Sequence, residues 1–104
     1  MRHALFQYFD EVVYRRFPLP MRRFLLELSL FPSFDAEQAR MVSGENNAGE
    51  LLRTLQEDTT MMLFDDLERC HFWEVFQQFL QWELAREYTL EQQKALYIRG
   101  GLYY

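Results

Sequence analysis

The densest group of potentially reactive side chains in the sequence lies in the stretch 69–80, RCHFWEVFQQFL. It contains the one cysteine of the chain, Cys70, followed directly by His71 and two residues later by Trp73. A thiol beside an imidazole could bind a metal ion or act as a nucleophile paired with a base. Both uses require the two side chains to reach the same point in space.

The alternation of residues 69–73 predicts a short β-strand, and a strand cannot bring these two groups together. Neighbouring side chains on a strand point to opposite faces, so Cys70 and His71 cannot easily bind one ion. His3 is far away in sequence, and the chain has no C-x-x-C, H-x-x-x-H, G-x-S-x-G or glycine-rich phosphate motif. We therefore expect no catalytic residue, no metal site and no enzyme activity, and we interpret Cys70 as buried packing.

Composition limits the possible partners of the chain. It has 104 residues, 49% of them hydrophobic, and a formal net charge of -5 with an isoelectric point near 5.0. An acidic chain repels nucleic-acid phosphates unless it carries a local basic patch. The nearest approach to such patches is two arginine pairs, 15–16 and 22–23, which we interpret as solvated helix ends.

The cellular compartment is predicted from the cysteine content and from the lack of a signal peptide or membrane helix in the sequence. A single cysteine excludes a disulfide within the chain and suits a reducing environment. The N-terminus lacks the apolar region of a signal peptide, and no apolar run approaches the roughly 20 residues of a membrane helix. We expect a cytoplasmic protein with no membrane partner.

Helical periodicity and capping patterns predict four helices in the first 58 residues. An amphipathic helix is expected over residues 2–16, with Leu5, Phe6, Phe9, Val12 and Val13 on one face. A second, largely buried helix begins near Pro20 and ends near residue 31. The remaining two are expected to begin after the capping residues Asp35 and Asn47 and to end at Ser43, before Gly44, and at about Asp58.

In the second half of the chain the spacing of the hydrophobic residues changes twice, first to the alternation of a strand and then back to the period of a helix. Residues 59–74 predict a β-hairpin with an acidic turn at 65–68. A helical stripe then follows from Glu74, carried by Phe76, Phe79, Leu80 and Leu84. Thr89 caps a last helix that we expect to contain Gly100 and Gly101 and to stop at the end of the chain without a termination signal.

This order of elements predicts a mainly α fold, a winged helix flanked by additional helices. The expected organisation is an N-terminal linking helix over 1–18, a winged-helix core over 19–74 with its wing hairpin near 59–74, and C-terminal helices over 75–104. The last segment would lead into a truncated helical-repeat region, and the chain looks like part of a longer protein.

A winged helix suggests DNA binding, but the expected reading helix is acidic. It carries Glu50, Glu57 and Asp58 against the single Arg53, so phosphate groups would repel it. Protein contacts are the better interpretation. The aromatic side chains that we expect at an interaction surface are Trp73, Trp82, Tyr97, Tyr103 and Tyr104, although they could also cover each other within the fold.

Nearly the whole chain resembles the winged-helix segment of the MalT-like, LuxR-type transcriptional activators, which belong to the STAND class of signal-transduction ATPases. Each motif that carries the resemblance is weak alone, and their order and spacing together are fairly specific. They are YFDEVV at 8–13, FLLELS at 24–29, ELL at 50–52 with Leu55, VFQQFL at 75–80 and YIRGGLYY at 97–104.

The resemblance implies a place in a larger protein. The expected partners are the ATPase and helical-repeat sensor domains of the same chain, with possible self-association. DNA would be bound only through a separate C-terminal domain, and ATP or ADP only by the full-length protein, so this segment would hold no cofactor. The alternative is a stand-alone winged-helix protein that binds DNA or acts as an adaptor.

One position departs from the family pattern. Family members often carry a histidine between the wing and the next helix that can approach the phosphates of a bound nucleotide. Aligned on Phe76 and Phe79, this sequence has Trp73 at that position, and His71 falls two residues earlier. A neutral indole cannot supply a cationic contact to phosphate, so the resemblance does not transfer a nucleotide-binding role to either residue.

Overall fold

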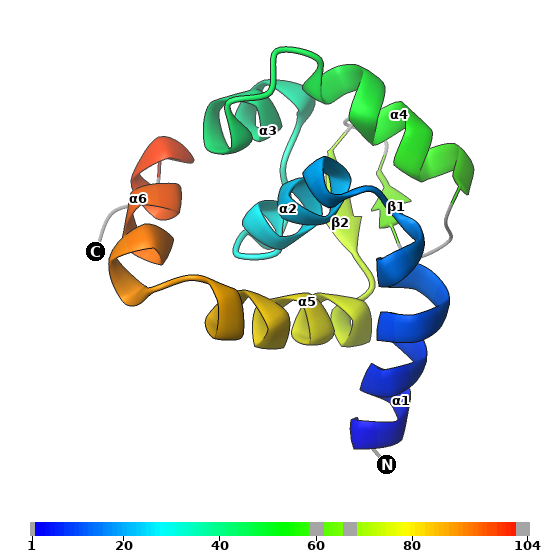
Figure 1. Cartoon of the computed structure of the whole chain (residues 1–104). Coiled ribbons are helices and arrows are strands. Elements are labelled where there is room, and N and C mark those ends of the chain that lie inside the picture. The colour runs from blue at the N-terminus through cyan, green and yellow to red at the C-terminus, as the bar shows by residue number, and fades with distance from the viewer. Residues whose placement is uncertain (1, 59–61, 66–68, 102–104) are drawn as a thin grey trace.

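The computed structural model describes residues 2–58, 62–65 and 69–101 (Figure 1). Helix α1 (Arg2–Tyr8) continues as a π-helical turn, η1 (Phe9–Val13), and a 3-10 turn, η2 (Tyr14–Arg16). The elements that follow are α2 (Leu19–Leu28), α3 (Ala36–Ser43), α4 (Ala48–Asp58), β1 (Met62–Phe64), β2 (Cys70–Phe72), α5 (Glu74–Glu87) and α6 (Leu90–Arg99).

Helices α2, α3 and α4 form the helix-turn-helix unit that the capping signals predict. Pro18 in extended conformation precedes α2, which is buried at Met21 and from Phe24 to Leu28, while Arg23 is exposed. The Asp35 side chain accepts a hydrogen bond from the Gln38 amide at the start of α3. Gly44 ends α3 in the left-handed conformation, with φ 77°.

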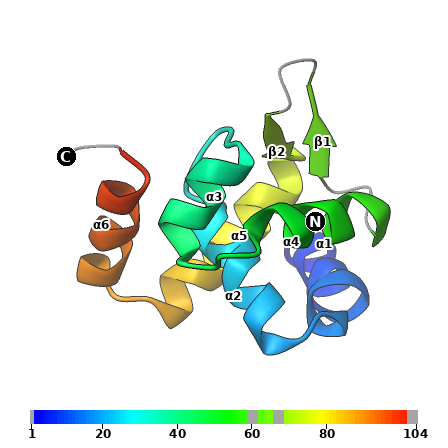
Figure 2. The same cartoon turned by 90° about the horizontal axis from the view of Figure 1, so that it is seen from above.

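The wing is an antiparallel hairpin in which Met62 pairs with Phe72, Leu63 with His71 and Phe64 with Cys70. Phe34, in the loop before α3, adds a bridge to the other side of Cys70 through two backbone hydrogen bonds of 2.9 and 2.7 Å. Figure 2 shows that the hairpin extends away from the helices. The fold is therefore a mainly α winged helix, as predicted.

The core is dominated by aromatic rings from α1, η1 and α5. The Phe9 and Phe76 rings lie 5.3 Å apart, and the Phe6 and Phe79 rings 5.7 Å apart, both edge to face. These residues belong to the same hydrophobic cluster as the helix-turn-helix and the wing. The described residues of the predicted flanking segments 1–18 and 75–104 therefore contribute to one core with those of the predicted segment 19–74.

The buried face of the first helical segment, residues 2–16, differs from the predicted one. The buried residues are Phe6, Phe9 and Tyr14, whereas Leu5 and Val12, predicted on the same face as Phe6 and Phe9, are exposed. Phe9 and Tyr14 are five residues apart across the π-helical turn, a spacing that the predicted constant period of 3.6 residues does not give.

The last helix is shorter than predicted and packs against α3 at the end of the molecule opposite α1 (Figures 1 and 2). It ends at Arg99, so Gly100 and Gly101 lie outside it, and Gly101 has φ 85°. The capping box of Thr89 and Gln92 that opens it is present as predicted. None of the helices in the described part of the chain has the length and hydropathy needed to cross a membrane.

Candidate functional site

The wing strand β2 separates the two side chains that first suggested chemistry. Cys70 points into the core with 1% of its surface exposed, while His71 lies on the opposite, half-buried face. Alternation along the strand is the cause. Among residues 2–58, 62–65 and 69–101 no group of three or more His, Cys, Asp or Glu side chains could hold a metal ion.

The Cys70 thiol is in an environment that suppresses its reactivity. Burial raises its pKa to about 11, and the negative charges of Asp35 and Asp65 act in the same direction. The thiolate is the nucleophilic form of cysteine, and its population at neutral pH is small at such a pKa. The geometry and the electrostatics therefore agree with the interpretation of Cys70 as packing.

Trp73 lies between the wing and α5, where its backbone is the N-cap of that helix. Its carbonyl accepts the 2.8 Å bond from the Gln77 amide, but its side chain makes no capping hydrogen bond, and 48% of the residue is exposed. Helix N-caps favour side chains with an oxygen that can accept from the first turn. An indole at this position is explained neither by capping nor by full burial.

The other predicted interaction residues do not lie beside Trp73. Trp82, 44% exposed, is on α5 beside Phe6 of α1, with the Arg86 guanidinium 4.7 Å from its ring. Tyr97 is half-buried on α6 against the Phe31 ring at 5.7 Å. The predicted contributions of Tyr103 and Tyr104 fall outside the described residues. The described members of the set therefore occupy three separate places.

Helix α4 occupies the position of a reading helix and has an acidic outer face. Ala48, Leu52 and Leu55 are buried against the core. The outer residues that could meet a ligand include Glu50, Arg53, Thr54, Gln56 and Glu57. Among these described side chains two are acidic and one is basic, so DNA phosphates would repel them on balance.

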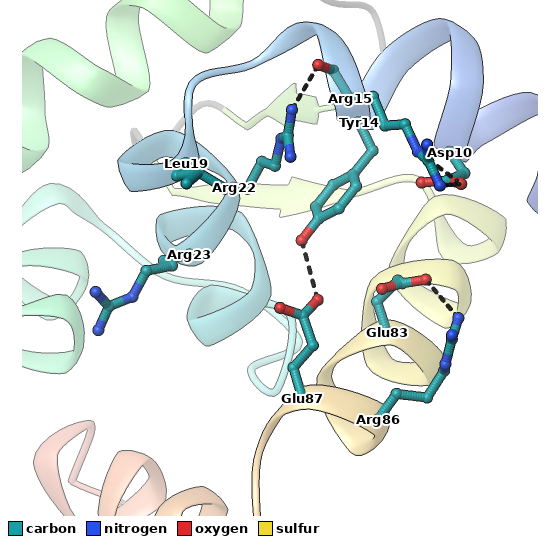
Figure 3. A pocket seen from close by; sticks show the side chains of 9 residues that line it. All are labelled: Asp10, Tyr14, Arg15, Leu19, Arg22, Arg23, Glu83, Arg86 and Glu87. Carbon is teal, nitrogen blue, oxygen red and sulfur yellow. Dashed lines mark hydrogen bonds and ion pairs between the residues drawn. The ribbon is translucent and has the colours of Figure 1, made fainter.

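A charged pocket of about 390 Å³ lies between η1, η2, α2 and α5 (Figure 3). Its lining residues are Asp10, Tyr14, Arg15, Leu19, Arg22, Arg23, Glu83, Arg86 and Glu87. Much of the charge is paired within the pocket, through Arg15–Asp10 (3.1 Å), Arg86–Glu83 (3.0 Å) and the Tyr14 hydroxyl donating to Glu87 (3.4 Å). We interpret the pocket as a structural charge network that joins α5 to the N-terminal turns.

Sequence reasoning missed the buried polar contacts of this region. Glu27 on α2 is buried and accepts a 2.7 Å hydrogen bond from the Tyr88 hydroxyl at the end of α5. Burial raises the pKa of Glu27, and the hydrogen bond from Tyr88 opposes that rise. These residues are 61 positions apart, so no local pattern could have indicated the pair.

Comparison with known protein families supports the architecture. The family model of the MalT winged helix domain matches residues 9–92, from η1 to the first turn of α6. No curated protein matches the chain at a significant level. Because the match covers most of the sequence, including the complete helix-turn-helix, wing and α5, the chain belongs to the MalT winged helix domain family.

Proposed function

We propose that this domain is a non-catalytic regulatory and interaction module of a LuxR-type, MalT-like transcriptional regulator of the STAND class. Membership of the MalT winged helix domain family indicates a regulatory domain of a MalT-like regulator. The finer proposal is that the domain works through contacts with the ATPase and sensor domains of the same chain.

The acidic face of α4 is the observation that carries this proposal. In a DNA-reading winged helix this helix presents donors such as Arg, Lys, Asn or Gln to base edges. Here Glu50 and Glu57 are exposed on it beside the donors Arg53 and Gln56, and the chain has a net charge of -5. A domain with this surface is better suited to protein contacts than to phosphate contacts.

Trp73 is the residue that we expect at the centre of the protein contact. Large aromatic side chains contribute strongly to interfaces when a partner removes them from water. Trp73 is half exposed, and it stands at an N-cap where another residue type would stabilise the helix better. A local preference that is violated in this way is common at functional positions.

The remaining chemistry belongs to other parts of the proposed regulator. ATP or ADP would bind to the ATPase module, and promoter DNA to a separate C-terminal domain, in the cytoplasm. This domain would contribute contacts that stabilise one state of the regulator relative to another.

A binding titration tests the proposal. The ATPase module of the same gene product, expressed separately, is titrated with this domain in a calorimeter. Binding is expected, and Trp73→Ala is expected to weaken it at least about fivefold, as for an interface residue whose truncation costs more than 1 kcal/mol. Leu90→Ala is the matched control, because Leu90 is an exposed apolar residue on α6, distant in sequence from the wing.

Two results would contradict the proposal. If Trp73→Ala binds like the unmodified domain, Trp73 is not at the contact. If the gene encodes no ATPase module and the domain binds duplex DNA, the stand-alone winged-helix protein is the correct interpretation.

A further inference from the structure

The side-chain amide of Gln38 on α3 lies between Arg69, the residue directly before β2 of the wing, and the end of α6. Its Nε2 donates to the Gly100 carbonyl at 3.0 Å, and its Oε1 accepts from Arg69 Nη2 at 3.4 Å. A primary amide carries its donor and its acceptor on different atoms, so one orientation of Gln38 satisfies both neighbours. The contact with Arg69 therefore favours the orientation that binds Gly100.

Arg69 is held to the wing and to the loop before α3 at the same time. Its backbone amide donates to Asp65 Oδ1 at 3.0 Å, and its carbonyl accepts from the Asp65 amide at 3.0 Å, at the end of the hairpin where the turn joins the two strands. Its Nε donates to Ser33 Oγ at 3.1 Å, and its Nη1 lies 3.8 Å from Asp35 Oδ2. A displacement of this end of the hairpin would therefore displace the guanidinium that contacts Gln38.

The end of α6 is attached closely at this same place. A Cβ added to Gly100 would lie 2.4 Å from the Phe31 ring, so the backbone of Gly100 is in direct contact with that ring. Among the described residues of α6, Leu96 is the one that is fully buried, while Leu90 and Ile98 are exposed. The last turn of α6 is thus held by the buried Leu96, by the contact of Gly100 with Phe31 and by the Gln38 hydrogen bond.

We infer that Gln38 couples the position of the wing to the attachment of the α6 end. Figure 2 shows α3 between these two elements, and Gln38 is the α3 residue that bonds to both. If a contact moves Arg69 away from Gln38, the Oε1 atom of Gln38 loses its hydrogen bond. The side-chain amide is then less well oriented, and the hydrogen bond from its Nε2 atom to Gly100 becomes weaker. The wing and the end of α6 then respond to each other through the side chain of Gln38.

Amide hydrogen exchange of the complete 104-residue chain tests this coupling. The reporters are the amides of Gly100 and Gly101, which bond to the carbonyls of Leu96 and Ile98. Arg69→Met and Gln38→Met are each expected to raise the exchange rate of these amides about two- to tenfold, as for the loss of one hydrogen bond. The double variant is expected to exchange no faster than Gln38→Met alone, because both changes interrupt the same connection.

Three further measurements keep the test decisive. Arg40→Met is the matched control on α3, since Arg40 pairs with Glu37 of the same helix, and it is expected to leave both amides unchanged. Amides of the buried helix α2 report global unfolding and should exchange equally in all variants. Arg69→Lys retains the charge and serves if Arg69→Met does not fold, and it should also raise the rate, because an ammonium cannot replace the guanidinium fork.

The inference is overturned if an Arg69 variant exchanges at these two amides as the unmodified chain does. It is also overturned if the effects of Arg69→Met and Gln38→Met multiply in the double variant, because independent contacts would then hold the wing and α6.

Discussion

At the scale of single residues, Trp73 has a side chain that the fold does not require at its position. Its backbone begins α5, its side chain gives the helix no cap, and about half of it remains in contact with water. The structure therefore places an aromatic surface residue at the junction between the wing and the first turn of α5.

The missing cap leads to a stability prediction. Trp73→Asp and Trp73→Ala both remove the indole, but only aspartate can accept from the first-turn amides of α5. We expect the Asp variant to be more stable than the Ala variant by about 1 kcal/mol. Urea unfolding of the two variants measures the difference, and equal free energies of unfolding would show that position 73 is not a cap that a side chain can complete.

Cys70 provides a second prediction at this scale. Because burial raises the pKa of Cys70 to about 11 and encloses the sulfur, iodoacetamide should modify the folded chain far more slowly than the urea-unfolded chain at pH 8. Mass spectrometry follows the modification. Equal rates in the two states would mean that the thiol is accessible and the interpretation as packing is wrong.

The raised pKa of Glu27 predicts that the free energy of unfolding depends on pH. Burial raises its pKa in the folded chain, so the stability that protonated Glu27 contributes is complete below the unfolded pKa of about 4.3 and is lost as the pH rises through the folded pKa. Glu27→Gln mimics the protonated form and can still accept from Tyr88. The free energy of unfolding of this variant minus that of the unmodified chain should therefore increase from pH 4 to pH 7. A pH-independent difference would contradict the assignment.

At the scale of elements, sequence and structure agree where a local signal sets the boundary. Asp35 and Thr89 accept from the amides three residues later and begin their helices, and Gly44 ends α3 with a positive φ. They disagree where packing over a distance decides. The π-helical turn at Phe9–Val13 was not predicted, and its first residue, Phe9, packs against Phe76 of the distant helix α5.

The end of α6 gives the prediction at this scale. Gly100→Ala would place a methyl group 2.4 Å from the Phe31 ring and 3.0 Å from Val42, which are both buried. We expect a loss of about 1–3 kcal/mol in the free energy of unfolding, as for other insertions into packed sites. Gly49→Ala on α4 is the matched control, because its new Cβ would meet only Ala36 at 3.9 Å.

A neutral Gly100→Ala variant would contradict the close packing of α6 on Phe31. A Gly49→Ala variant as unstable as Gly100→Ala would show that the loss reflects the backbone and not the contact. The control is expected to be neutral or slightly stabilising, since alanine favours helix over glycine.

At the scale of the whole molecule, the winged-helix architecture could be predicted from the sequence. The spacing of its hydrophobic residues changes from helical to strand-like and back to helical, which is an unusual order. Three helices with caps, a short alternating segment and a returning helical stripe around Phe76 predicted the fold that is observed. The candidate site was less predictable. That Trp73, Trp82 and Tyr97 lie apart, and that Arg69, Gln38 and Gly100 lie together, depends on how the helices pack, which a sequence pattern does not encode.

We propose that this winged helix does not read DNA and works through protein contacts. The most direct test is a fluorescence-anisotropy titration of a labelled DNA duplex with the 104-residue chain at low and physiological salt. We predict no saturable binding up to about 100 μM, weaker than the usual nonspecific range. Tight binding that falls steeply with salt concentration would contradict the claim, because it would show a phosphate-binding surface on this acidic domain.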